Sequence, residues 1–185
     1  MKTKKNLAIA IVLLVSVASF AQNKSKLTIG NAKMDAKKNI MQNLEASSEF
    51  SSAGKLFAVA EFKELLSDNN EEYTILAPTN TAIATNSKEK LNDLLEPVNM
   101  FHAKDVAAYH IIPGKWLATD FGRLLRTKGT PEVKTASGEI LIVSYENGNL
   151  FLTDKNGNKA KLIITDALQS NGILHGIDNV FSPSR

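Results

Sequence analysis

Histidine is the first residue type to consider, because its imidazole binds metals and transfers protons near neutral pH. The chain has three, at His102, His110 and His175. None of them forms a His-x-x-x-His pair, and without Cys no Cys-x-x-Cys motif exists either, so a metal site has no local signature. A His beside apolar neighbours is more commonly hydrogen-bonded at a structural junction. We expect that half-buried structural role for His110 and His175, and no bound metal.

The motifs of the common enzyme classes are missing as well. The sequence has no Gly-x-Ser-x-Gly elbow for a serine hydrolase, and neither Gly-x-Gly-x-x-Gly nor Gly-x-x-x-x-Gly-Lys for binding phosphates. Nothing among the 19 acidic residues singles out a pair of glycosidase carboxylates. We therefore expect no enzymatic activity and no cofactor.

Trp116 is the remaining candidate for binding. It follows the turn formed by Pro113 and Gly114, with Lys115 beside it. A partly exposed aromatic side chain near a loop can stack on a sugar or on a partner protein. The alternative is that Trp116 only covers the edge of a sheet.

The N-terminus has the features of a secretory signal peptide over residues 1–21. Lys2, Lys4 and Lys5 precede an apolar run from Leu7 to Phe20, and small residues suit cleavage after Ala21. The alternative, a transmembrane anchor, would need a longer run, roughly 20 residues. The signal peptide predicts export to the periplasm or the extracellular space, with no integral membrane segment after cleavage.

Removal of this leader changes the charge of the chain. The sequence has 22 Lys and Arg against 19 Asp and Glu, and the loss of three Lys leaves 19 of each sign. A balanced charge gives no support for nucleic-acid binding. Since there is no Cys, stability has to come from a hydrophobic core.

The pattern of the exported part predicts an α+β fold in one domain. Residues 22–38 are polar and rich in Lys, which indicates a flexible arm. The region from 39 to about 66 has helical spacing, broken by Gly54 and Ser pairs into short helices. Further short helices are expected over 87–95 and from about 102 to 109. From 139 onward short alternating strands separated by Asn-Gly turns predict a meander.

Three apolar segments are expected to meet in the sheet. The segment 171–181 opens with Asn171 and Gly172, and its apolar residues fall on both faces of a strand, which is typical of a strand inside a sheet. The segments 73–80 and 109–114 are its expected neighbours. Pro78 ends the first of them, and Thr79 or Asn80 is expected to cap the turn that follows.

Together these three segments resemble the fasciclin domain family. Tyr73-Thr74-Ile75-Leu76-Ala77-Pro78-Thr79-Asn80 is similar to the family's Thr-Val-Phe-Ala-Pro-Thr-Asn block, Tyr109-His110 to its Tyr-His segment, and Asn171-Gly172-Ile173-Leu174-His175 through Ile177-Asp178 to its Asn-Gly-Val-Ile-His-x-Ile-Asp block. The resemblance covers 39–185 as one domain. It departs at Ile83, where the family usually has Phe.

The resemblance implies a wedge-shaped β-sandwich with several helices packed on it. It also implies a non-enzymatic role in adhesion, with a cell-surface or matrix protein or a glycan as partner. The motif residues expected to be structural are Thr74, Ala77, Pro78, Thr79, Asn80, Asn171, Gly172, His175 and Asp178.

The resemblance also gives candidate contact positions. In animal members the Tyr-His segment and a stretch before the last block are implicated in integrin recognition, and here these are Tyr109, His110, Asp166 and Leu168. Together with Trp116 they are the partner-binding candidates, although Tyr109 and His110 also suit a packed, hydrogen-bonded position. The alternative function is that of a carrier, since some relatives hold an apolar pigment or lipid between helices and sheet.

Overall fold

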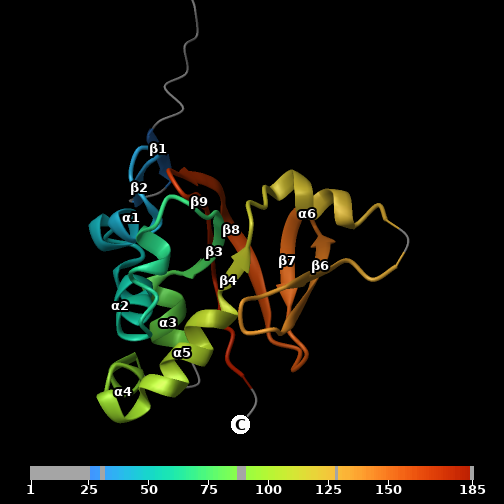
Figure 1. Ribbon diagram of the computed structural model, residues 1–185. Coiled ribbons are helices and arrows are strands. Elements are labelled where there is room, and N and C mark those ends of the chain that lie inside the picture. The colour runs from blue at the N-terminus through green and yellow to red at the C-terminus, as the bar shows by residue number, and fades with distance from the viewer. Residues whose placement is uncertain (1–25, 30–31, 87–90, 128, 184–185) are drawn as a thin grey trace, which may run out of the picture.

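The computed structural model describes residues 26–29, 32–86, 91–127 and 129–183 (Figure 1). The expected signal peptide lies outside these residues. The helices are α1 (Ile40–Ala46), α2 (Ser51–Val59), α3 (Asn80–Asn86), α4 (Leu91–Leu94), α5 (Met100–Tyr109) and α6 (Ala118–Leu124), with 3-10 turns η1 (Leu65–Ser67) and η2 (Pro97–Asn99). The strands are β1 (Lys26–Ile29), β2 (Ala32–Asp35), β3 (Tyr73–Pro78), β4 (Ile111–Pro113), β5 (Glu132–Lys134), β6 (Ile140–Glu146), β7 (Asn149–Thr153), β8 (Lys159–Gln169) and β9 (Gly172–Ile177).

The three expected segments do meet at one end of a seven-stranded sheet, whose order is β4-β3-β9-β8-β7-β6-β5. Strand β9 lies between β3, to which it is parallel, and β8, to which it is antiparallel. Ile75 is in register with Ile111 on one side and with Leu174 on the other. Every residue of β3 and β9 is buried, as the apolar pattern of the two strands predicted.

Side chains of the central strands alternate between two hydrophobic clusters. Ile75 and Leu174 join the cluster under α1, α2 and α5, whereas Leu76 and Ile177 join the cluster formed with α6 and β5–β8. Figure 1 shows this division, with α1 to α5 on one side of β3 and β9, and α6, β6 and β7 on the other. The shared strands therefore form the wall between two cores, which is why they are apolar on both faces.

The sheet bends strongly and its two ends approach each other. The edge strand β4 accepts a hydrogen bond at the carbonyl oxygen of Ile111 from the backbone N of Ala136, just beyond β5, at 2.7 Å. Along β8 the pairing with β9 shifts register between Leu162 and Ala167, and Asp166 has a left-handed φ of 59° there. Such a bulge bends a strand and increases its twist. The result is the expected α+β fold, with a sandwich-like sheet and helices packed against it.

Part of the expected flexible arm is ordered. Strands β1 and β2 form a two-stranded antiparallel sheet, and Met34 is buried in the first cluster. Asn43 of α1 binds both the backbone N and the carbonyl oxygen of Asp35, each at 2.9 Å. These contacts, which a polar and Lys-rich composition does not reveal, join residues 34–38 to the domain.

Several other elements differ from expectation. The sequence predicted a helix over 87–95. Residues 87–90 lie outside the described residues, and the rest of this range contains α4. Helix α6 and strand β5 were not predicted. No helix in the described ranges combines the length and the apolar character that crossing a bilayer requires.

Candidate functional site

The motif residues of β3 fasten neighbouring segments to the sheet. The Thr74 hydroxyl donates to the carbonyl oxygen of Gly114 at 2.7 Å and accepts from the backbone N of Trp116 at 2.8 Å. The Thr79 hydroxyl caps α3 by accepting from the backbone N of Ala82, which confirms the cap expected after Pro78. Asn80 instead caps the neighbouring helix, because its Oδ1 accepts from the backbone N of Ser52.

The Asn-Gly block before β9 has an equally structural arrangement. Asn171 is fully buried; its amide nitrogen donates to the carbonyl oxygens of Leu66 and Asp68, and its Oδ1 accepts from the backbone N of Ile40. At Gly172 a Cβ atom would collide with the carbonyl oxygen of Tyr73 on β3. Only glycine permits this approach of β9 to β3. Asp178 accepts at Oδ1 from the backbone N of Lys161 at 2.8 Å, and Ala77 is fully buried.

His110 connects helix α5 to the segment that follows β9. Its Nδ1 is 2.8 Å from the carbonyl oxygen of Val106, and its Nε2 accepts from the backbone N of Phe181 at 3.1 Å. The carbonyl can only accept, so the proton is on Nδ1. Burial of the ring lowers the pKa of His110 to about 4, although the Val106 bond opposes the shift. His110 is thus neutral, and it is completely buried where the sequence suggested half-buried.

Tyr109 is also internal. Its ring lies 5.8 Å from that of Phe181, and none of its surface is exposed. Burial raises the pKa of the Tyr109 phenol, and the negative charges of Asp154 and Glu139 add to the increase. Neither Tyr109 nor His110 therefore offers a side chain that a partner of the folded protein could contact.

His175 brings Asp166 and Trp116 together, and its ring lies 5.5 Å from that of Phe121, in the same cluster as Tyr109 and Phe181. His175 Nε2 is 2.8 Å from the carbonyl oxygen of Trp116, and its Nδ1 accepts from the backbone N of Asp166 at 3.3 Å. The Asp166 carboxylate binds elsewhere, accepting from the backbone N of Ala118 at 2.7 Å. The carboxylate therefore does not orient the imidazole, as it would in a catalytic His–Asp pair. Burial lowers the pKa of His175, against the opposing effects of the Trp116 bond and the Asp166 charge.

These bonds hold Trp116 in a fixed position at the surface. Its indole Nε1 donates to the carbonyl oxygen of Pro113 at 3.1 Å, and its ring stacks on the buried ring of Phe121 with centroids 5.8 Å apart. The side chain remains partly exposed. Leu168, the last contact candidate, is 39% exposed on β8, in register with Ile173.

Trp116 borders two open grooves. One has a volume of about 330 Å³ and lies along α6, where Lys115, Asp120 and Arg123 line it. The other has a volume of about 500 Å³ and lies between β4 and the turn after β5, with Lys134, Thr135 and Ser137 in its wall. The first groove could not be predicted from the sequence, because α6 itself was not predicted.

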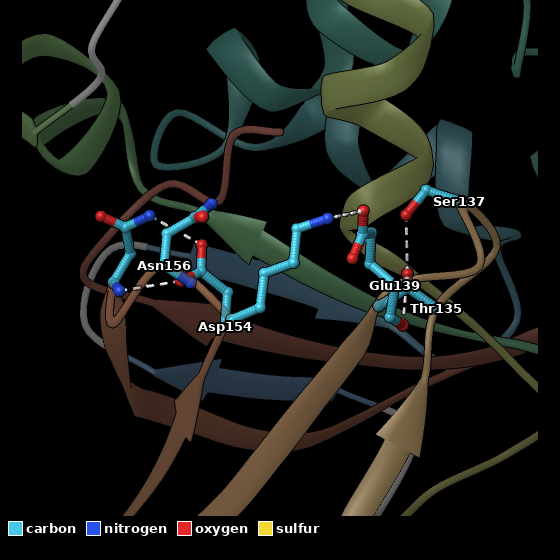
Figure 2. A network of polar contacts seen from close by, with 7 residues as sticks. Thr135, Ser137, Glu139, Asp154 and Asn156 are labelled. Carbon is cyan, nitrogen blue, oxygen red and sulfur yellow. Dashed lines mark hydrogen bonds and ion pairs between the residues drawn. The ribbon is translucent and has the colours of Figure 1, made fainter. Parts of the chain in front are cut away.

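The wall of the second groove is a turn held by polar contacts (Figure 2). Thr135 and Ser137 hydroxyls lie 2.8 Å apart, and the Lys155 ammonium contacts Glu139 Oε1 at 2.5 Å. Asp154 in turn accepts from the backbone N atoms of Asn156 and Asn158. Figure 2 shows these two turns near each other, and the ion pair between Lys155 and Glu139 connects them. Across the described ranges, no group of three or more His, Asp and Glu side chains could hold a metal ion.

The bent mixed sheet with helices packed against it defines the class of the protein, an α+β domain. The fasciclin domain model matches residues 48–183, and the chain belongs to that family. Helix α1 precedes the matched range, but Ile40 and Leu44 are buried in the same core.

Relatives and a solved structure agree with this assignment. Protein sll1483 from Synechocystis is 28% identical over 169 residues, covering 91% of this chain and 87% of that protein. Human periostin is 26% identical over 149 residues, which are 80% of this chain but 16% of periostin. A FAS1 domain pair from the insect cell adhesion molecule fasciclin I matches with a TM-score of 0.70 at 18% identity, over 79% of this chain and 51% of that one.

Proposed function

We propose that the protein is an exported, non-enzymatic adhesion module that binds a cell-surface or extracellular protein or glycan. The observation that carries this proposal is the contrast between the two buried histidines and the tryptophan at the surface. His110 and His175 are buried and use both ring nitrogens in structural bonds, whereas Trp116 is fixed at the surface between two open grooves. A rigid aromatic side chain with a polar rim suits the binding of a partner rather than the transformation of a substrate.

The family supports the same proposal, since the matching solved structure comes from a cell adhesion molecule. The alternative carrier function would require room between helices and sheet. Among the described residues, large buried side chains pack in that region, Phe50 and Phe57 among them. This packing favours the adhesion module over the carrier, and the absence of a co-purifying pigment or lipid in native mass spectrometry would agree with it.

The test is retention of cell-surface preparations on beads that carry the protein. We expect Trp116→Ala to reduce retention at least about fivefold, because a fixed aromatic anchor is typical of binding hot spots. The matched control is Phe101→Ala, which removes an aromatic side chain that is 80% exposed on α5 and should leave retention unchanged. Equal retention by wild type and Trp116→Ala would contradict the proposed site.

A further inference from the structure

The Trp116 surface has a marked excess of positive charge. Lys115, Arg123, Arg126 and Lys134 line its two grooves and an adjoining hollow on α6, and the single acid among the lining residues is Asp120. Both oxygens of that carboxylate are already engaged, one with the backbone N of Leu117 and the other with Arg123. Lys115 is paired with Glu72 at 2.6 Å, whereas Arg126 and Lys134 form no ion pair with the described residues, so these two carry the excess positive charge.

The aromatic platform at the centre is rigid before any ligand arrives. Four contacts fix it: the indole donates to Pro113, the ring stacks on Phe121, the backbone N binds Thr74, and the carbonyl oxygen binds His175. A platform that is already ordered loses little conformational entropy when it binds. The flat apolar ring suits the apolar face of a pyranose, while the exposed Thr127 and Ser137 in the groove walls offer hydroxyls to those of a sugar.

From this combination we propose that the Trp116 surface binds an acidic polysaccharide whose carboxylates are those of uronic acids. One sugar ring stacks on Trp116, and its neighbours extend into the two grooves and the adjoining hollow on α6. Their carboxylates meet Arg123 and Lys134 in the grooves and Arg126 in the hollow. The guanidinium of Arg123 already binds one carboxylate, that of Asp120, at 3.1 Å, and its side chain is still 75% exposed. The planar fork of Arg matches the geometry of a carboxylate. The inference rests on the proposed adhesion function and names its partner.

Affinity electrophoresis in native gels tests the inference, with the full protein run through gels containing polygalacturonate, dextran or dextran sulfate. We expect polygalacturonate alone to retard the wild type, and added salt to weaken this retardation. Trp116→Ala should weaken binding at least about tenfold, as expected for the loss of an anchor. The double variant Arg123→Gln and Arg126→Gln should also weaken binding of polygalacturonate. Both side chains are exposed, so this variant tests the inference even if Trp116→Ala does not fold.

The controls separate this inference from the proposed function. Phe101→Ala and Lys104→Gln, which change an exposed aromatic and an exposed cation away from the grooves, should bind polygalacturonate like the wild type. Equal retardation by dextran sulfate would show binding by charge alone and overturn the uronate assignment. The absence of retardation by polygalacturonate would also overturn the uronate assignment. If Trp116→Ala still reduced cell-surface retention in that case, the proposed adhesion function would stand without this partner.

Discussion

His110 joins distant parts of the chain, because its ring connects Val106 in α5 to Phe181, which lies 71 residues after His110 and beyond β9. Its ring also lies 5.6 Å from that of Phe181. One imidazole thus satisfies two buried backbone groups and fills space in the core. In the same way, His175 joins the Trp116 loop to the bulge in β8. At the scale of single residues, the histidines act as fixed connectors of buried backbone.

Replacement of His110 should therefore affect folding and not binding. We expect His110→Ala to lower the free energy of unfolding by about 2–4 kcal/mol, because it leaves a cavity and an unsatisfied backbone N at Phe181. Denaturant unfolding measures this, with Lys104→Ala on the exposed face of α5 as the control that changes stability by less than about 1 kcal/mol. An unchanged melting temperature together with lost partner binding would make His110 a contact residue.

The strands β3 and β9 form the central element, and their parallel pairing depends on Gly172. The apolar residues on both faces of the terminal segment were sufficient to predict its place inside a sheet. Helix α6 could not be predicted in this way. It has seven residues, contains Gly122, and is fixed by tertiary contacts such as the bond from Ala118 to Asp166 across 48 residues. The grooves were missed for the same reason, since they arise where α6 and the β5–β6 turn meet Trp116.

Gly172→Ala tests the close approach of these two strands. Its Cβ would collide with the carbonyl oxygen of Tyr73, so the strands would have to separate, and we expect a loss of at least about 2 kcal/mol in the free energy of unfolding. Gly122→Ala is the matched control, because a Cβ there meets nothing within 4 Å and glycine is unfavourable in a helix. It should be neutral or stabilise by up to about 1 kcal/mol. A melting temperature unchanged by Gly172→Ala would mean that β3 and β9 do not approach so closely.

Across the described part of the molecule, β3 and β9 separate two cores, and the buried rings of His110 and His175 both contact phenylalanines of the second one. Trp116, Asp166 and His175 could be assigned to one domain from the sequence, but not to one cluster, because their contacts depend on the bend of β8. The Tyr-His segment shows a related limit. Its place next to the central strands followed from the pattern, whereas complete burial depends on how Phe181 folds back over it.

Neutral burial of both histidines predicts that mild acid destabilises the whole fold. In the unfolded chain a His takes up a proton near pH 6.5, whereas in the folded protein burial lowers the pKa of His110 to about 4. The unfolded state then binds more protons between these values, so stability is complete above pH 6.5 and falls as the pH decreases toward 4. From pH 7 to 5.5, His110 alone should lower the free energy of unfolding by about 1 kcal/mol.

His175, whose pKa is also lowered, adds to the loss in the same direction. Denaturant unfolding at a series of pH values in this range measures the slope, and His110→Gln provides the control, because glutamine keeps polar atoms near Val106 and Phe181 without titrating. Between pH 7 and 5.5, the free energy of unfolding of this variant should fall by about 1 kcal/mol less than that of the wild type. Equal changes for both proteins would mean that His110 keeps its ordinary pKa in the fold, and that solvent reaches its ring.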